Sequence, residues 1–239
     1  MNKEEFKDEM LNYLSKLKID LSEKQINQFY DYMILLIEWN KVMNLTGIAE
    51  PREIIIKHFV DSLTVFKYLD NNSTIIDVGT GAGFPGIPIK ILYPNTEIIL
   101  LDSLNKRINF LNEVINKLNL NHIKTIHGRA EDFGTNIEYR EKNDIAIARA
   151  VAPLNILLEY LMPFVKVKGK CICMKGLSAK EELENSKNAL KELKGKLIEN
   201  ENFVIPDTDI KRNILVIEKT GILPNTYPRK AGTPRKKPL

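Results

Sequence analysis

Residues 75–86 read Ile-Ile-Asp-Val-Gly-Thr-Gly-Ala-Gly-Phe-Pro-Gly, an apolar run that breaks into four glycines just before a helical pattern begins. α/β proteins approach nucleotide-like ligands with this arrangement, in which an apolar strand leads through a glycine-rich turn into a helix. Glycine suits such a turn because the backbone adopts positive φ and because a Cβ would hold a ligand away. The stretch predicts an α/β fold with a ligand site at this turn; a tight turn without a ligand is the alternative.

A second apolar run, residues 97–102, ends in Asp102, which lies 23 residues after Gly79. This separation is close to the roughly 20 residues expected for a carboxylate that accepts hydrogen bonds from ribose hydroxyls. A helix N-cap or a solvated strand end is the alternative role for Asp102. The acid at the tip of the next strand, together with the glycine turn, favours a cofactor site.

The bulk composition indicates a soluble globular chain. Of its 239 residues, 44% are hydrophobic and 28% are charged, which is ordinary for a folded protein, and no apolar run approaches a membrane span. The first residues are charged and mixed, and no apolar signal-peptide core follows them, so we expect a cytoplasmic protein. Cys171 and Cys173 alternate along one strand-like run, and we expect them to be small buried side chains in a reducing compartment.

Positive charge gathers at the C-terminal end of the chain. After Glu218 there is no acid, and the net charge of +4 falls to about −2 when the six cations of this end are left out. A nearly neutral body with a basic end suggests a phosphate-rich partner that is contacted from one side, and a solubilising tail is the alternative. These six cations are Lys219, Arg229, Lys230, Arg235, Lys236 and Lys237.

The apolar periodicity divides the chain into three parts. Residues 1–70 carry three amphipathic helices, the second begun by a capping box at Ser22 and Gln25 and the third by Pro51, and we expect a helical cap packed on the body. Residues 71–220 form the α/β body, and residues 221–239 a basic tail. The predicted strands are 74–79, 97–102, 123–127, 144–149, 169–174, 202–206 and 213–219, and the predicted helices of the body are 86–93, 105–119, 153–163 and 178–195.

The last two predicted strands distinguish between two α/β classes. The first five strands alternate with helices, which implies a parallel sheet with right-handed crossovers. Only residues 207–212 separate the last two strands, so these must form a hairpin and one of them must run antiparallel. A mixed, seven-stranded Rossmann-like sheet of this kind indicates a class I S-adenosylmethionine-dependent methyltransferase, whereas a dinucleotide dehydrogenase more often keeps a parallel sixth strand.

Several stretches make the assignment more specific. Residues 77–89, beginning Asp-Val-Gly-Thr-Gly-Ala-Gly-Phe-Pro-Gly, resemble the cofactor motif of the bacterial small-subunit ribosomal RNA methyltransferase G family, also called the GidB family. The likeness extends from about Tyr30 to Lys219 and includes residues 40–46, 57–62, 101–107, 128–132 and 148–151. It implies methyl transfer from S-adenosylmethionine to N7 of one guanine in 16S ribosomal RNA near the decoding site. The expected partner is this RNA or the small ribosomal subunit, the expected state is a monomer, and no membrane is involved.

Position along the fold assigns roles to the cofactor residues. The glycines let the backbone approach the cofactor, Phe84 lines its pocket, and Ala130 and Glu131 lie where this fold receives the adenine. Asp77 either supports the loop or faces the amino-acid end of the cofactor. The predicted cofactor-binding residues are Asp77, Gly79, Gly81, Gly83, Phe84, Asp102, Ser103, Ala130, Glu131 and Arg149.

Arg149, at the end of the fourth strand, is the candidate catalytic residue, in a positioning role. It could clamp the cofactor carboxylate or an RNA phosphate, donate to guanine O6, or form a strand-end salt bridge. Lys175 is a phosphate contact or a solvated lysine. We predict no metal site, because the three histidines lack metal-ligand spacing, and we expect His58 to be a hydrogen-bonded core residue. The predicted RNA-binding residues are Lys175, Arg229, Lys230, Arg235, Lys236 and Lys237.

Three other functions compete with this interpretation. A methyltransferase of the same fold could act on a small molecule or a protein, and a dinucleotide-binding dehydrogenase could carry a similar glycine turn. A non-enzymatic RNA-binding module with a vestigial pocket is the third. A dehydrogenase would bind NAD, whereas a methyltransferase would bind S-adenosylhomocysteine. A module with a vestigial pocket would keep its cellular function when Gly81 is replaced with Val.

Overall fold

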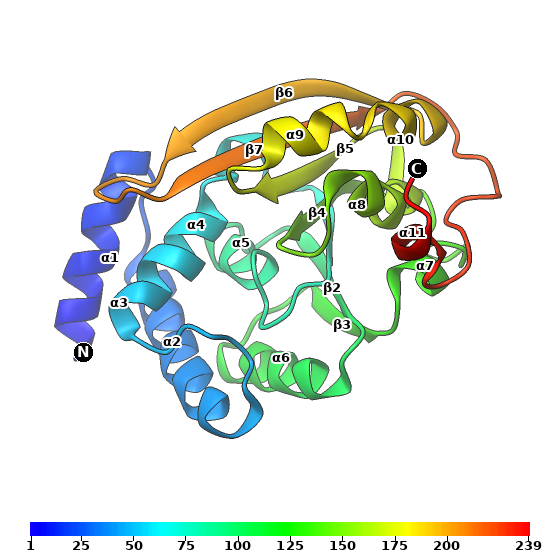
Figure 1. Cartoon of the computed structure of the whole chain (residues 1–239). Coiled ribbons are helices and arrows are strands. Elements are labelled where there is room, and N and C mark those ends of the chain that lie inside the picture. Colours follow the sequence, from blue (N-terminus) through cyan, green and yellow to red (C-terminus); the bar gives the residue numbers. More distant parts are fainter.

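The computed structural model describes residues 1–239 and centres on a seven-stranded sheet with helices on both faces (Figure 1). The strand order is β3-β2-β1-β4-β5-β7-β6, the first five strands run parallel, and β7 is antiparallel to both of its neighbours. This is the mixed sheet predicted from the terminal hairpin. The strands are β1 Thr74–Val78, β2 Glu97–Asp102, β3 Ile123–His127, β4 Asn143–Arg149, β5 Val165–Lys175, β6 Gly195–Val204 and β7 Lys211–Lys219.

Successive residues of the central strands face two separate cores, as the pleat of a strand requires. Ile75 belongs to a cluster of 37 buried residues on one face of the sheet, and Ile76 to a cluster of 22 on the other. Cys171 and Cys173 both lie in the second cluster and are fully buried, which confirms their prediction as core side chains. Because both faces are covered, the central strands read as continuous apolar runs.

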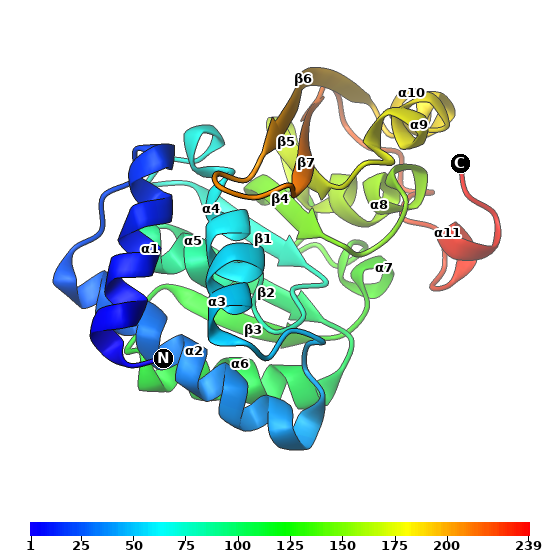
Figure 2. The same ribbon diagram turned by 60° about the vertical axis from the view of Figure 1, so that its left-hand side comes forward.

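The N-terminal helices cover the face of the larger cluster (Figure 2). Helix α2 begins at the predicted capping box. The backbone N–H of Gln25 donates to Ser22 Oγ, and the backbone N–H of Ser22 donates to Gln25 Oε1. Phe6, Phe29 and Phe59 bring α1, α2 and the following helical segment into one core with the sheet. The elements are α1 Lys3–Leu17, α2 Glu23–Met43, α3 Pro51–Ile54, a π-helical turn η1 Ile55–Val60, α4 Asp61–Leu63 and a 3₁₀ turn η2 Phe66–Tyr68.

The remaining helices follow the strands of the body. Helices α5 and α6 lie on the same face as the N-terminal helices, and α8 and α10 pack on the other face. None of the helices combines the length and the apolar character that a membrane span requires. Their bounds are α5 Gly86–Leu92, α6 Asn105–Lys117, α7 Ala130–Phe133, α8 Leu154–Leu161, η3 Met162–Phe164, α9 Ala179–Glu184, α10 Lys187–Glu192 and α11 Thr233–Lys236.

Two predictions are wrong near β6, at the edge of the sheet. Strand β6 begins at Gly195, seven residues before the predicted start, and the helix predicted over 178–195 is divided into α9 and α10. Strand β6 is an edge strand with charged and amide side chains and a bulge between Leu197 and Glu199, so it lacks the apolar run on which its prediction depended. Polar residues and a bulge protect such an edge from pairing with other chains.

The residues after β7 do not project from the body as a tail. They run back across the face that carries α8, where Leu223 and Pro234 are buried and α11 lies beside α8 and α7 (Figure 1). We call residues 221–239 the C-terminal strap. Its packing brings cations from the end of the chain to the carboxyl ends of the parallel strands.

Candidate active site

The glycine-rich turn after β1 has the backbone that its sequence predicts. Gly79, Gly81 and Gly83 adopt φ of 71°, 64° and 101°. A Cβ on Gly79 would lie 2.8 Å from Val151 Cγ2, and one on Gly83 would lie 2.6 Å from the Tyr32 hydroxyl. A Cβ on Gly81 would meet no atom within 4 Å, so Gly81 faces open space and owes its identity to the backbone.

Asp77 lies buried beneath this turn and holds it. Its Oδ2 accepts from Thr80 Oγ1 at 2.6 Å and from the Gly86 amide at 2.8 Å, while Oδ1 is buried without a partner. Burial raises the pKa of Asp77 to about 7, against the opposing effect of these two hydrogen bonds and of Arg149. Of the two roles left open by the sequence, the contacts correspond to loop support.

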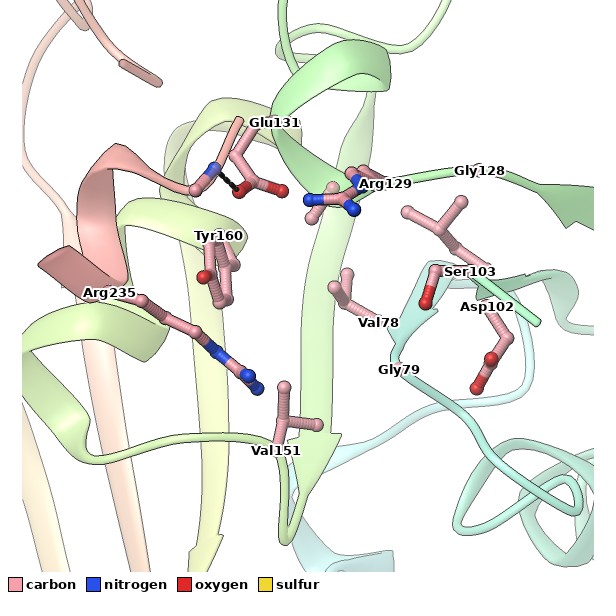
Figure 3. A pocket seen from close by; sticks show the side chains of 13 residues that line it. Val78, Gly79, Asp102, Ser103, Gly128, Arg129, Glu131, Val151, Tyr160 and Arg235 are labelled. Carbon is pink, nitrogen blue, oxygen red and sulfur yellow. Dashed lines mark hydrogen bonds between the residues drawn. The ribbon is translucent and has the colours of Figure 1, made fainter. Parts of the chain in front are cut away.

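A pocket of about 250 Å³ opens where the tips of β1, β2 and β3 meet (Figure 3). Five of the predicted cofactor residues line it: Gly79, Asp102, Ser103, Ala130 and Glu131. Its other lining residues were not among the predicted cofactor-binding residues, although most of them lie in or next to the stretches that resemble the family. These residues are Val78, Leu101, Gly128, Arg129, Val151, Tyr160, Gly232 and Arg235.

Asp102 is fixed at the edge of this pocket by three donors. Its Oδ2 accepts from the Gly81 amide at 2.9 Å, its Oδ1 accepts from the Leu104 amide at 2.9 Å, and Arg107 Nη1 lies 3.1 Å from Oδ2. The carboxylate therefore links the second strand to the glycine turn. Because a carboxylate offers about four lone-pair sites, one acceptor position remains for a ligand hydroxyl.

Phe84, also predicted to bind the cofactor, is not among the residues that line the smaller pocket. Its ring is 5% exposed and is stacked between His58, at 4.3 Å between ring centroids, and Tyr32, at 5.4 Å. Tyr32 of α2 also donates a hydrogen bond to the Ala82 carbonyl, so the N-terminal helices contact and support the glycine turn. The apolar ring is buried because the helical cap covers the end of the turn.

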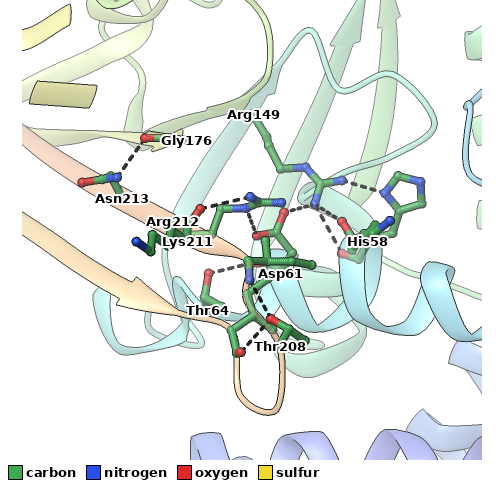
Figure 4. A network of polar contacts seen from close by, with 12 residues as sticks. His58, Asp61, Thr64, Arg149, Gly176, Thr208, Lys211, Arg212 and Asn213 are labelled. Carbon is green, nitrogen blue, oxygen red and sulfur yellow. Dashed lines mark hydrogen bonds and ion pairs between the residues drawn. The ribbon is translucent and has the colours of Figure 1, made fainter. Parts of the chain in front are cut away.

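A larger cleft, of about 650 Å³, adjoins the pocket and shares Val151 with it. Arg149 lines this cleft rather than the pocket. Asp61, which is 1% exposed, accepts from Arg149 Nη1 at 2.7 Å and from Arg212 Nε at 2.8 Å, and thereby orients both guanidinium groups (Figure 4). Such charge-assisted bonds fix a planar side chain in one orientation.

His58 completes this network as a neutral side chain. Arg149 Nη2 lies 3.2 Å from Nδ1, and Nε2 lies 2.9 Å from Thr46 Oγ1. Burial and the neighbouring Arg149 lower the pKa of His58 to about 3, so Nδ1 accepts and Nε2–H donates. His58 is the hydrogen-bonded core residue that the sequence predicted.

Two of the predicted RNA-binding residues are engaged with carboxylates. Lys175 Nζ lies 2.7 Å from Glu182 Oε2 and also donates to the Ala152 carbonyl. Arg229 Nη2 lies 2.6 Å from Glu159 Oε2, and Glu159 is fully buried. Lys230, Arg235, Lys236 and Lys237 are exposed, and Arg235 also lines the smaller pocket.

The residues missed at this site carried little local signal. Asp61 lies within the stretch 57–62 that resembled the family, but nothing in that stretch marks its partner Arg212 on β7. Tyr160 reads as an ordinary apolar position of α8, and Val151 as a loop residue. No three His, Cys, Asp or Glu side chains gather in an arrangement that could hold a metal ion.

Comparisons with known proteins agree with this architecture. A SAM-dependent methyltransferase structure from Aquifex aeolicus superimposes with a TM-score of 0.54 at 16% identity and covers 73% of this chain and 97% of its own, which shows the fold. Precorrin-6y C5,15-methyltransferase from Geobacter metallireducens superimposes with a TM-score of 0.50 at 13% identity and covers 75% of this chain and 92% of its own.

Relatives in sequence match over nearly the whole chain. The ribosomal RNA small subunit methyltransferase G of Acetivibrio thermocellus is 54% identical over 222 residues, which are 92% of this chain and 91% of the relative. The protein of the same name from Clostridium novyi is 47% identical over 242 aligned positions and covers both chains completely. The family model described as rRNA small subunit methyltransferase G matches residues 25–211. The chain belongs to this family, the GidB methyltransferases.

Proposed function

We propose that the chain transfers the methyl group of S-adenosylmethionine to N7 of one guanine in 16S ribosomal RNA near the decoding site, in the cytoplasm. The proposal builds on membership of the GidB family and on the two adjoining cavities at the carboxyl ends of the strands. The first cavity receives the cofactor and the second receives the target base.

The residues of the smaller pocket suit S-adenosylmethionine, which supplies an electrophilic methyl group on a sulfonium. Asp102 keeps an acceptor position for the ribose hydroxyls, and the open side of Gly81 lets the backbone approach the ligand. Ala130 and Glu131, which follow β3, border the end of the pocket that we assign to the adenine. We assign Arg149 to the substrate side, because it lines the larger cleft.

The contiguity of the two cavities carries the proposal. Val151 is the wall that they share, so a base in the larger cleft would lie next to a donor in the smaller one. Four cationic side chains and two carboxylates line the cleft, which favours a polyanionic substrate. The cations are Lys57, Arg149, Lys175 and Arg212, and the carboxylates are Asp61 and Glu182.

The state of the titratable groups in the cleft favours N7 as the acceptor atom. Asp61 is shared by two guanidinium groups, Glu182 is paired with Lys175, and both nitrogens of His58 are occupied. None of these groups is free to take a proton. Guanine N7 carries an in-plane lone pair and loses no proton when it is methylated, so it needs no general base.

Arg149 is then a positioning residue for the base. Four acceptors hold its Nη1 and Nη2, while its Nε–H has no hydrogen-bond partner in the chain. This N–H donor, like the second N–H of Nη2, suits guanine O6, which lies beside N7 on the same edge of the base. Holding the base in line with the donor supplies catalysis through orientation.

A methylation assay tests the proposal. Purified protein, tritiated S-adenosylmethionine and either 16S RNA or small subunits from a strain that lacks the enzyme should give N7-methylguanosine at one site after nuclease digestion. Titration calorimetry should show that the protein binds S-adenosylhomocysteine and does not bind NAD. Label on another atom, on protein or on a small molecule would contradict the proposal, as would tight binding of NAD.

A further inference from the structure

The C-terminal strap is fixed to the body by contacts that local sequence does not reveal. Arg140 donates from Nη1 to the Tyr227 carbonyl at 2.8 Å and from Nη2 to the Leu223 carbonyl at 3.0 Å. The Leu223 amide in turn donates to Glu141 Oε1 at 3.1 Å. These bonds hold the first half of the strap against the segment that precedes β4.

A buried ion pair holds the middle of the strap. Arg229 donates four hydrogen bonds to the fully buried Glu159 of α8, from its backbone amide at 2.7 Å, from Nε at 2.9 and 3.1 Å and from Nη2 at 2.6 Å. A carboxylate without solvent access requires such a partner. The positive charge of Arg229 therefore balances a buried carboxylate of the same chain.

The end of the strap forms one wall of the smaller pocket. The Gly232 amide donates to Glu131 Oε1 at 2.9 Å, which places the short helix α11 beside the residues that follow β3. Three residues further on, Arg235 points from α11 into the pocket, on the side of Tyr160 and across from Asp102 and Ser103 (Figure 3).

The neighbours of Arg235 identify the end of the pocket that it serves. Glu131, Tyr160 and Arg235 all line this pocket, and burial and Glu131 raise the pKa of the Tyr160 hydroxyl while Arg235 opposes this rise. The Arg235 guanidinium lies beside Val151 and opposite Asp102 (Figure 3). An arginine that shares the pocket with Glu131, on the adenine side of our assignment, and lies opposite Asp102, on the ribose side, is suited to the adenosyl part of a ligand.

We propose that Arg235 is a cofactor-binding residue whose planar guanidinium packs on the adenosyl group, and that the C-terminal strap is the device that brings it there. This inference rests on the proposed function of the pocket. A guanidinium stacks on aromatic faces and keeps its charge in any state of the protein, which a lysine cannot reproduce. It also changes the sequence prediction, which assigned Arg235 to RNA.

Calorimetry with two ligands tests this assignment. S-adenosylhomocysteine contains the adenosyl and amino-acid parts, whereas 5′-methylthioadenosine lacks the amino-acid part. In Arg235→Ala, the Kd for both ligands should rise about tenfold. In Arg235→Lys it should stay several-fold above wild type, because an ammonium has no flat face. Lys237→Ala is the matched control, since Lys237 is exposed and does not line the pocket.

The outcomes separate this inference from the proposed function. If Arg235→Ala binds both ligands within twofold of wild type, the inference is overturned although the pocket still holds the cofactor. If only S-adenosylhomocysteine is weakened, Arg235 contacts the amino-acid end and the assignment is also overturned. If wild type binds neither ligand, the proposed function itself fails. Melting temperatures of all variants, expected to match wild type, distinguish a lost contact from a lost fold.

Discussion

Two buried aspartates of this site, Asp61 and Asp77, differ in how their negative charge is balanced. Asp61 lies between two guanidinium groups, and its charge is balanced where it stands. Asp77 has a hydroxyl and an amide on one oxygen and nothing on the other, so burial dominates and its pKa rises to about 7. The first carboxylate orients two arginines that line the larger cleft, and the second supports the glycine turn at a cost in stability.

The raised pKa of Asp77 predicts a pH-dependent stability. Between the unfolded pKa of 3.8 and the folded value of about 7, the folded protein binds more protons at Asp77 than the unfolded chain does. Stability therefore falls as pH rises through this window. Relative to Asp77→Asn, which cannot ionise, wild type should lose about 2–3 kcal/mol in free energy of unfolding between about pH 5 and pH 8. Urea denaturation of both proteins across this range measures the difference, and a constant difference would refute the prediction.

Removing the charge of Asp61 should leave two guanidinium groups without their shared partner. Asp61→Asn is expected to lower the free energy of unfolding by about 3–5 kcal/mol, as for other broken buried pairs. Denaturant titration provides the measurement. Glu184→Gln, which breaks an exposed pair with Lys187, serves as the control and should leave the midpoint unchanged. A midpoint for Asp61→Asn equal to that of the control would show that the network is not structural.

At the scale of elements, the sequence predicted well wherever one apolar run formed one buried strand. Strand β2 has its predicted bounds, and its last residue, Asp102, lies in the pocket as expected. The π-helical turn η1, within the predicted third helix, was not predicted, and its extra residue brings Val60 and Asp61 into the buried set beside the predicted face. Strand β6 was misplaced because an edge strand does not need apolar residues on both faces.

The glycine turn offers two replacements that separate cofactor binding from folding. Gly81→Ala meets no atom within 4 Å but must keep positive φ, at a cost of about 1–2 kcal/mol, so the fold should survive while S-adenosylhomocysteine binds at least tenfold more weakly. Gly86→Ala would bring a Cβ to 2.4 Å from Leu100 Cδ2 and 2.8 Å from Asp77 Oδ2, so it should destabilise the fold.

Thermal melting and calorimetry on both variants check this pair. Gly86→Ala should lower the melting temperature more than Gly81→Ala does. Wild-type affinity in Gly81→Ala would contradict the role of the turn in binding the cofactor.

At the scale of the whole molecule, long-range contacts set the limit of what the sequence predicts. Local patterns predicted the mixed sheet and placed Gly79, Asp102 and Glu131 in one pocket, because the tips of parallel strands meet at one edge. They did not predict that Arg212 lines the larger cleft, nor that Arg235, expected to contact RNA, lines the smaller pocket. The hairpin of β6 and β7 places Arg212 beside Asp61. The C-terminal strap, which Arg140 and Glu159 hold against the body, places Arg235.

Charge on the strap predicts the salt dependence of RNA binding. Lys230, Lys236 and Lys237 are exposed, and we expect them to contact phosphates without selecting the base. Replacing all three with Gln should reduce the slope of log K against log salt by about 2, since each single-strand contact contributes roughly 0.7. Filter binding at several salt concentrations measures the slope.

The matched control replaces Lys3, Lys18 and Lys24, in the N-terminal region, with Gln. It changes the net charge equally and should leave the slope near wild type. Equal slopes in both variants would exclude a specific contact between the strap lysines and RNA.

The two fully buried thiols of β5 have a practical consequence for anyone who handles this protein. Burial holds the pKa of Cys173 at about 12 and that of Cys171 above its ordinary value, so neither sulfur ionises in the native state. Alkylating reagents should therefore modify the protein only when the central sheet opens. The rate of that modification reports global unfolding directly, without an attached label.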